Sequence, residues 1–425
     1  MKRNVILKIG IVVALMSSTG VISTSCSSNG NEIENPEEEE IIDLGEKELA
    51  NCYIVQEAGK YKFLADNQFN LGEGLPVPPV IYPVEAKLIW QTVNGAVKSV
   101  EISFLDEKPF VIFEVEEAKG NALIAVLDSN GEICWSWHIW MPEEEIYSVY
   151  SSTGYEVMNM NLGAITATPG NALSYGLLYQ WGRKDPFPAS ATLTGTTTTV
   201  SAPMYDINGD PVSITNSDWF STTNNTIAYS ISHPTECISN YSQYSVTRDW
   251  LIPTETNDAL WGNPEGGYRD ATNNTYPNKG RKTCYDPSPA GWRVPPSDVF
   301  RDYTTSGGYA WDYSDFNITD INNDNVLNNG DYNYGWHFNV NDKVILYFPA
   351  AARFDGSYAM LMGSMAGLWG NYWSNSPYPS IAGGGFCALS FQVKDQSGND
   401  IVTVSPSGGG SRADAYSIRC IRDKN

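Results

Sequence analysis

The residues that could do chemistry are few in this chain. Its 425 residues include three histidines and seven cysteines. Three histidines leave little room for a multi-histidine metal centre. The sequence also has no Gly-x-Ser-x-Gly nucleophile motif, no His-Glu-x-x-His zinc motif and no glycine-rich phosphate loop. We therefore expect a protein that binds rather than catalyses.

One acidic loop has the spacing of a calcium site. Over the twelve residues 320–331, side-chain oxygens occupy places one, three, five and twelve, at Asp320, Asn322, Asp324 and Asp331. The backbone carbonyl at place seven belongs to Val326. Calcium prefers such oxygen ligands, and the spacing is that of a dockerin-type loop. Asn325 replaces the usual glycine at place six, and no flanking helices are evident. A calcium loop and an ordinary asparagine-rich loop both remain open, and no cofactor is required.

A short aromatic cluster is the candidate for ligand binding. Trp369, Tyr372 and Trp373 stand beside Asn371. Rings together with amides suit the faces and the hydroxyl groups of sugars, but the same residues also suit a hydrophobic core. We favour packing for this cluster and expect Trp369 to be its exposed ring.

The N-terminus has the order of a secretory signal peptide. Three basic residues precede an apolar run over 9–16, and small polar residues lead to Cys26. The run is too short to span a membrane, which takes about 20 residues. The stretch 22–26 resembles a bacterial lipoprotein box, which implies removal of residues 1–25, acylation of Cys26 and a lipid-anchored outer-membrane location. Ordinary cleavage is the alternative, because Ser23 and Ser25 satisfy a small-x-small rule.

The charge of the chain excludes some partners. It has 26 Lys and Arg against 49 Asp and Glu, which gives a formal net charge of −23. Nucleic acids and anionic membrane surfaces are held by clusters of cations, so we expect neither as a partner. The acidic, polar stretch that follows Cys26 predicts a flexible tether over 26–45.

Seven apolar runs bounded by turn residues follow the tether. They span 50–55, 60–65, 86–91, 98–105, 110–116, 121–128 and 132–140. Val100, Ile102 and Phe104 alternate with polar residues, as in a half-buried strand. Asn130 and Gly131 predict a hairpin turn. Seven strands within 46–142 predict an immunoglobulin-like β-sandwich.

The first and last of these runs contain two cysteines, a histidine and tryptophans whose roles have to be considered. Cys52 and Cys134 either form a disulfide in an oxidising compartment or remain two buried thiols. His138 has no second histidine or carboxylate nearby in the sequence, so we expect a hydrogen-bonded structural histidine. Trp135 and Trp137 share one face of a strand, and we expect them to pack in the core or at a domain interface.

The rest of the chain, 150–425, carries a series of motifs. They are MNMNLGA at 158–164, GLLYQWGR at 176–183, PAGWRVP at 289–295, YFPAA at 347–351, NYWS at 371–374 and SIRCIRD at 417–423. In this order they resemble the Fibrobacter succinogenes major paralogous domain. The preceding sandwich resembles a module often placed before that domain in Bacteroidota surface lipoproteins. The resemblance implies a mainly β and α+β protein with a C-type-lectin-like domain, distantly akin to the formylglycine-generating enzyme fold, and no single activity.

Cysteines within this region suggest crosslinks. Cys284 and Cys420 lie in or next to family motifs and far apart in the sequence, and we expect a disulfide between them that closes a long loop. Cys237 and Cys387 are the candidates for a second pair. With Cys26 acylated, six thiols remain, an even count that suits an exported protein. The only helix signal is modest and lies at 295–300.

These features predict a surface-anchored, non-catalytic binding protein. Its loops are rich in Tyr, Ser, Gly and Asn, which suit adaptable recognition surfaces. We expect an adhesin, or a fimbrial tip or accessory subunit, that recognises a glycan or a host or partner protein such as a pilin. Two alternatives stay open: a formylglycine-generating-like enzyme that uses Cys387 and Cys420, and a purely architectural envelope component.

Overall fold

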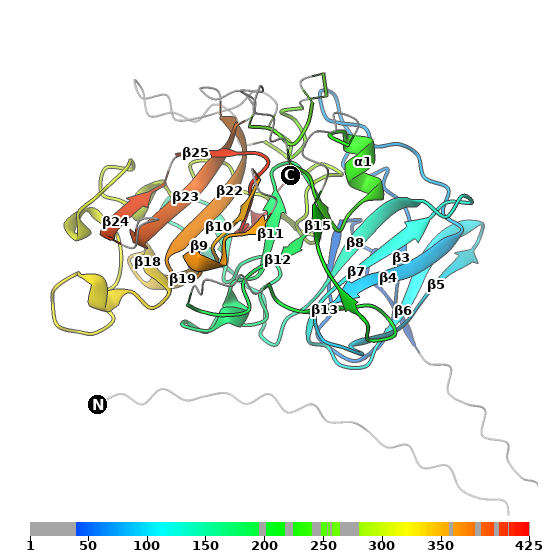
Figure 1. Ribbon diagram of the computed structural model, residues 1–425, viewed down its shortest axis with the longest axis horizontal. Coiled ribbons are helices and arrows are strands. Elements are labelled where there is room, and N and C mark those ends of the chain that lie inside the picture. Colours follow the sequence, from blue (N-terminus) through cyan, green and yellow to red (C-terminus); the bar gives the residue numbers. More distant parts are fainter. Residues whose placement is uncertain are drawn as a thin grey trace, which may run out of the picture. The chain divides into compact units, whose positions relative to one another are not determined.

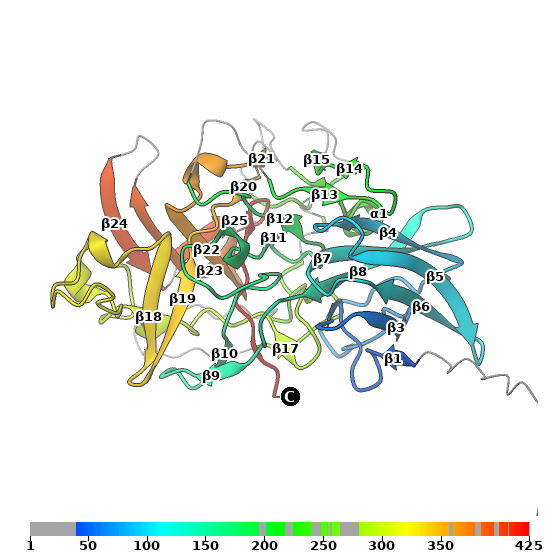
Figure 2. The same ribbon diagram turned by 90° about the horizontal axis from the view of Figure 1, so that it is seen from below.

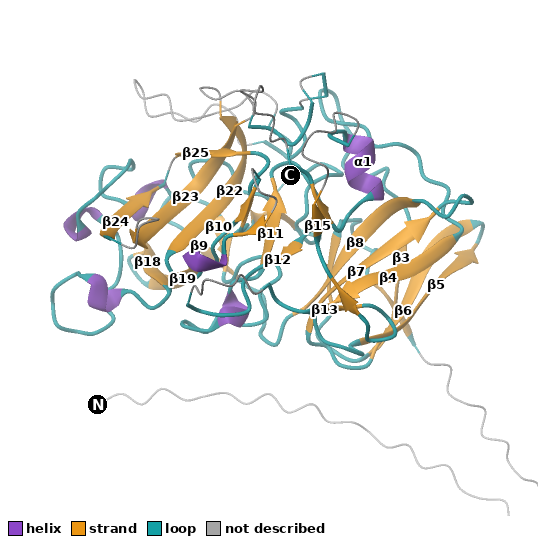
Figure 3. Cartoon of the chain, viewed as in Figure 1, coloured by secondary structure: helices purple, strands orange, loops and turns teal. Residues whose placement is uncertain are grey.

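The computed structural model describes most of the chain from residue 40 onward. The described residues are 40–194, 201–216, 224–239, 248–252, 254–255, 257–263, 280–356, 360–378, 384–394, 399–406 and 408–424. The protein is mainly β, as expected, and Figure 3 shows how strands dominate it. In the described residues one α-helix, α1 (Ile227–Ser232), accompanies five 3-10 helices: η1 (Ala172–Ser174), η2 (Arg301–Tyr303), η3 (Tyr313–Asp315), η4 (Asn329–Asp331) and η5 (Gly363–Met365). No helix among them is long and apolar enough to cross a bilayer.

The seven strands expected in the N-terminal part are all present. They are β2 (Cys52–Ile54), β3 (Gly59–Leu64), β4 (Glu85–Gln91), β5 (Val97–Leu105), β6 (Lys108–Val115), β7 (Gly120–Leu127) and β8 (Ile133–Met141). They lie in two sheets, at the right of Figure 1. One sheet has the order β1-β3-β6-β5, where β1 is Ile41–Asp43, and the other contains β4-β7-β8-β2. The expected hairpin turn joins β7 to β8, and Gly131 takes a φ of +81° there.

Strand β1 corrects the expected extent of the tether. The prediction placed residues up to 45 in a flexible segment, but Ile41, Ile42 and Asp43 pair in parallel with β3. Two adjacent β-branched residues favour an extended strand, and the edge of β3 satisfies their backbone groups. Residues 26–39, with Cys26 and most of the predicted tether, lie outside the described residues.

The second sheet of the sandwich is longer than expected. Its full order is β14-β13-β4-β7-β8-β2, where β13 (Met204–Tyr205) and β14 (Pro211–Val212) come from beyond the expected end of the sandwich. Tyr205 of β13 pairs with Gln91 of β4. The C-terminal region therefore completes a sheet of the N-terminal region.

The C-terminal region consists of short sheets. A sheet of β22 (Trp369–Tyr378), β23 (Gly384–Lys394) and β24 (Asp400–Ser405), with β25 (Gly408–Ser411) on β23, lies at the end of Figure 1 away from the sandwich. Beside it is the hairpin of β18 (Gly335–Asn341) and β19 (Val344–Pro349). The remaining strands are β9 (Ser148–Tyr150), β10 (Glu156–Met158), β11 (Leu177–Gln180), β12 (Phe187–Pro188), β15 (Thr215–Asn216), β16 (Glu236–Cys237), β17 (Trp292–Arg293), β20 (Phe354–Asp355), β21 (Met360–Leu361), β26 (Ala415–Tyr416) and β27 (Ile421–Arg422).

The last strands of the chain return to the first strands of this region. One sheet has the order β17-β27-β10-β9, and another has the order β12-β11-β26-β20-β21. In Figure 2 the strands β10 and β17 lie between the sandwich and the β18–β19 hairpin. The C-terminal residues thus hold together segments that are more than 250 positions apart, such as Val157 and Ile421.

The helix expected at 295–300 is absent. Backbone N–H groups in this stretch bond to carbonyls three residues back, from Val299 to Pro296 and from Arg301 to Asp298. The result is a run of turns that leads into η2. Bonds of this kind make tighter 3-10 geometry and rarely extend far, which explains why the signal does not become an α-helix.

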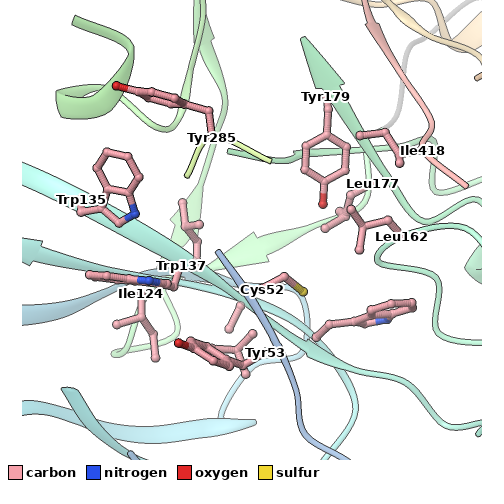
Figure 4. Packing of buried hydrophobic residues seen from close by; sticks show 14 of the residues in the cluster. Cys52, Tyr53, Ile124, Trp135, Trp137, Leu162, Leu177, Tyr179, Tyr285 and Ile418 are labelled. Carbon is pink, nitrogen blue, oxygen red and sulfur yellow. The ribbon is translucent and has the colours of Figure 1, made fainter. Parts of the chain in front are cut away.

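The two regions share one hydrophobic core. It contains sandwich residues such as Cys52 and Trp137 together with Leu162, Tyr179 and Ile418 from the C-terminal region, as Figure 4 shows. Residues 40–425 form one compact unit. The predicted boundary near residue 142 therefore does not separate two independent cores. A second core lies within the C-terminal region, around Trp336, Phe348 and Tyr372.

Candidate functional site

The aromatic cluster predicted to bind ligand is mostly core. Tyr372 and Trp373 are completely buried. The Tyr372 hydroxyl donates to the carbonyl oxygen of Pro349 at 2.7 Å, and the Trp373 ring lies 4.1 Å from that of Tyr416. Neither side chain can reach a ligand in solution, so the assignment of these two residues to a binding site is wrong. The preference for packing is confirmed.

Trp369 is the least buried member of that cluster, as predicted, yet it is not a free ring. It is half-buried, and its indole nitrogen donates to the carbonyl oxygen of Lys394 at 2.6 Å. The guanidinium of Arg353 lies 5.6 Å from the ring centre. One face is therefore already covered by a cation, which leaves little open surface for a sugar.

The open aromatic surface lies elsewhere, at Tyr309 and Trp311. Their side chains are 46% and 68% exposed, so Trp311 presents a large apolar ring to solvent. The two ring centres are 4.5 Å apart, and the ring planes are inclined by 61°. Large aromatic rings are usually buried in the core of a protein. A pair of exposed rings in contact is therefore typical of a recognition surface.

A strand-like contact fixes this pair. Ala310, between the two aromatic residues, exchanges backbone hydrogen bonds with Val404 of β24 at 2.9 and 3.1 Å. Ala310 is buried. Because side chains alternate along extended backbone, the residues on either side of Ala310 point to the opposite, solvent-facing side. The pair is held on the edge of the β22–β24 sheet rather than on a free loop.

A polar cleft is built on the same segment. It has a volume of about 430 Å³ and is lined by Arg301, Asp302, Thr304, Thr305, Ser306, Gly307, Phe316 and Asn317. The two sides of the segment are joined by a bridge between Thr304 and Phe316 and by a hydrogen bond from Thr305 N to Asp315 O at 2.9 Å. Hydroxyl, amide and charged groups thus line a hollow whose walls are fixed by backbone pairing. We call this cleft and the Tyr309–Trp311 pair the 301–317 site.

The sequence motifs did not indicate this site, although a signal for it exists. Gly307 and Gly308 precede a Tyr-Ala-Trp alternation, and Asp312 follows it. Alternation of this kind indicates a short strand with one exposed face, and the flanking residues are turn formers. The motif resemblance favoured NYWS instead, whose rings are buried.

The predicted calcium loop has part of the expected backbone. Asn323 and Asn325 take φ values of +61° and +64°, so asparagine does adopt the left-handed conformation at place six. The Asp320 carboxylate accepts from the backbone N–H groups of both, at 2.7 and 2.8 Å. Asp331 is buried and accepts from the N–H of Ile321 at 3.0 Å.

The other predicted ligand atoms also accept hydrogen bonds from within the loop. Asn322 and Asp324 accept backbone N–H groups two residues on, and the carbonyl of Val326 accepts from the Asn328 side chain at 2.8 Å. The loop is thus closed by its own hydrogen bonds. Within the described part of the chain, no group of three or more His, Cys, Asp and Glu is arranged to hold a metal ion. Calcium binding at this loop stays a prediction.

The cysteines do not form the expected crosslink. Cys284 and Cys420 are free thiols. The sulfur of Cys284 lies 3.7 Å from the carbonyl of Pro76, while the Cys420 thiol bonds to the Ser288 hydroxyl at 3.2 Å. The two thiols face different partners, so the predicted disulfide between them is wrong. Cys237 is free as well, and the side chain of Cys387 lies outside the described residues.

Burial keeps these thiols in the protonated form at neutral pH. It raises the pKa of Cys237, Cys284 and Cys420 to about 12. The nucleophile in cysteine chemistry is the thiolate, which is scarce at such pKa values. Cys52 and Cys134, for which a disulfide and two thiols were both open, are free thiols.

His138 has the structural role expected of it. Its Nε2 atom lies 2.8 Å from Asn121 Oδ1, and Asn121 donates in turn to the carbonyl oxygen of Gly163. Burial lowers the pKa of His138 to about 3, so the ring is neutral at physiological pH. Its Nδ1 atom is buried without a partner. The histidine therefore ties β8 to β7 and to the start of the C-terminal region.

Comparisons with known proteins add no relative. No family model matches the chain, and no match is found among curated proteins or among solved structures.

Proposed function

We propose that this chain is a lipid-anchored, non-catalytic binding protein of the cell surface that recognises a glycan through the 301–317 site. Export and acylation at Cys26 rest on the signal-peptide pattern. The finer fold, an immunoglobulin-like sandwich followed by a C-type-lectin-like domain, rests on the seven strands of the sandwich and on the motif order of the C-terminal region.

The observation that carries this proposal is the exposure of Tyr309 and Trp311 on the segment that also lines a polar cleft, whose residue Gly307 is two positions before Tyr309. An aromatic face packs against the C–H groups of a sugar ring, and nearby hydroxyl and amide groups bond to the sugar hydroxyls. The site offers both kinds of group on one segment. Host or partner proteins, including pilin subunits, are the alternative ligands for the same surface.

Catalysis has less support than binding. The formylglycine-generating hypothesis needs a reactive thiol, and Cys420 is buried with a pKa raised to about 12. A purely architectural role would not account for the exposure of Trp311.

A glycan array tests the proposal. The soluble unit 40–425, which has its own cores, should be retained by at least one glycan, and Trp311→Ala should lower that retention at least tenfold. Tyr82→Ala is the matched control, since this side chain is 77% exposed and lies in the loop between β3 and β4. Equal retention of all three proteins would refute the assignment of the site.

A further inference from the structure

The geometry points to a ligand class for the 301–317 site: we propose that it takes a neutral, single-chain glycan of at least two sugar units. Anionic glycans and flat crystalline polysaccharides do not fit it. This inference rests on the proposed function and adds to it which glycans are bound and which are rejected.

The angle between the two rings excludes a flat ligand. A plane of many parallel chains needs aromatic rings that lie in one plane, so that all of them touch it at once. Tyr309 and Trp311 are inclined by 61° with their centres 4.5 Å apart, an edge-to-face contact in which the two ring faces point in different directions. Only a ligand that curves or turns between units can contact both rings. An isolated hydrated chain does so, and a crystalline sheet does not.

The cleft sets the minimum length of the ligand. Gly307, in its lining, is only two residues from Tyr309, and two residues span at most about 7 Å. The cleft and the ring pair thus lie on neighbouring backbone, and a ligand that uses both needs at least two sugar units. The lining offers the hydroxyls of Thr304, Thr305 and Ser306, which suit the hydroxyl groups of that neighbouring unit.

The charges around the site exclude anionic ligands. Asp302, Asp312 and Asp315 lie on this segment, against the single cation Arg301. Arg301 already pairs with Asp302, with its Nε 3.1 Å from the carboxylate. Hydrogen bonds from Ser314 lower the pKa of Asp312, so this exposed carboxylate is ionised at neutral pH. A carboxylate or sulfate on the ligand would be repelled both here and by the whole chain, whose formal charge is −23.

Titration calorimetry with a small set of probes tests this inference. The probes are maltoheptaose and laminarihexaose as neutral chains, heparin and hyaluronan oligosaccharides as anionic chains, and microcrystalline cellulose, by pull-down, as a flat surface. The unit 40–425 should bind at least one neutral chain, and Trp311→Ala should weaken that binding at least tenfold. Raising the salt concentration should change the affinity less than twofold, because no net charge on the ligand is involved.

The outcomes separate the two levels of the proposal. Binding of an anionic chain or of cellulose that Trp311→Ala abolishes, without binding of a neutral chain, would overturn the ligand class and leave a glycan site in place. Failure to bind any probe would overturn both the ligand class and the glycan function. Binding of a neutral chain that Tyr82→Ala weakens as much as Trp311→Ala does would place the ligand away from the 301–317 site.

Discussion

Two pairs of aromatic residues with the same spacing differ in solvent exposure in this protein. Trp135 and Trp137 on β8 are buried, whereas Tyr309 and Trp311 beside β24 are exposed. Strand β8 is paired on both edges, with β7 and with β2, and its Trp137 packs against Phe63 of the facing sheet, with ring centres 5.1 Å apart. The 309–311 segment is paired at Ala310 alone, at the margin of its sheet. Spacing decides which rings share a face, and the surrounding elements decide whether that face meets water.

The largest expected effect is in the buried pair. Trp137→Ala should lower the free energy of unfolding by about 3–5 kcal/mol, because it leaves a large cavity between the sheets. Urea denaturation followed by circular dichroism measures this. The same measurement on Trp311→Ala should change the free energy by less than about 0.5 kcal/mol, since an exposed ring leaves no cavity. Similar losses in both variants would remove the distinction between the two pairs.

Acid should act on the buried region through His138. Burial lowers its pKa to about 3 in the folded protein, against about 6.5 in an unfolded chain. The unfolded chain therefore takes up a proton in this window and the folded protein does not. The stability from this group is complete above pH 6.5 and is lost as the pH falls toward 3. From pH 7 to pH 5 the loss is about 2 kcal/mol.

A His138→Gln variant isolates that contribution. Its amide can still donate to Asn121 Oδ1 but cannot take up a proton in this range. Stability curves of the two proteins between pH 5 and pH 7 should differ in slope by about 2 kcal/mol over the two pH units. Parallel curves would mean that His138 titrates normally and is not buried as described.

The exposed pair should matter for binding rather than stability. Tyr309→Ala removes one of the two exposed rings and should weaken binding of the glycan found on the array by about three- to tenfold, or about 1 kcal/mol. Its melting temperature should stay within about 1 °C of that of the unchanged protein. A large drop in melting temperature with unchanged affinity would show that Tyr309 is a packing residue.

Calcium should have the smallest effect on the stability of the protein and none on glycan binding. If the 320–331 loop binds the ion, calcium at five times its Kd stabilises the protein by about 1 kcal/mol. Asp324→Ala should abolish that gain, and glycan affinity should be the same with and without calcium. A calcium-dependent glycan affinity would join this loop to the 301–317 site, and the absence of any heat of binding would make it an ordinary loop.

Local patterns predicted the sandwich well and the binding surface poorly. All seven strands of the N-terminal region were expected, because each is an apolar run ended by turn residues. The sequence did not indicate β13, which adds two residues to a distant sheet, or the meeting of Val157 with Ile421. Such pairs depend on the tertiary fold and leave no periodic trace.

The prediction of the binding site was wrong for a related physical reason. The NYWS motif contains the residue types of a sugar site, but Tyr372 and Trp373 are completely buried, Tyr372 against Phe348 and Trp373 against Tyr416. Likewise, the spacing of Cys284 and Cys420 could not reveal that each thiol turns to a different neighbour. The sequence states the type of each residue. The burial of a side chain and the direction in which it points depend on how distant segments pack.

Oxidative footprinting of unit 40–425, with and without the glycan found on the array, is the most direct measurement. Hydroxyl radicals label a side chain according to its solvent exposure, so a ring covered by a sugar is protected. We predict strong labelling of Trp311 and Tyr309 in the free protein, protection of both by the glycan, and no change at Tyr82. Protection of other residues, with Trp311 labelled equally in both states, would contradict the assignment of this surface.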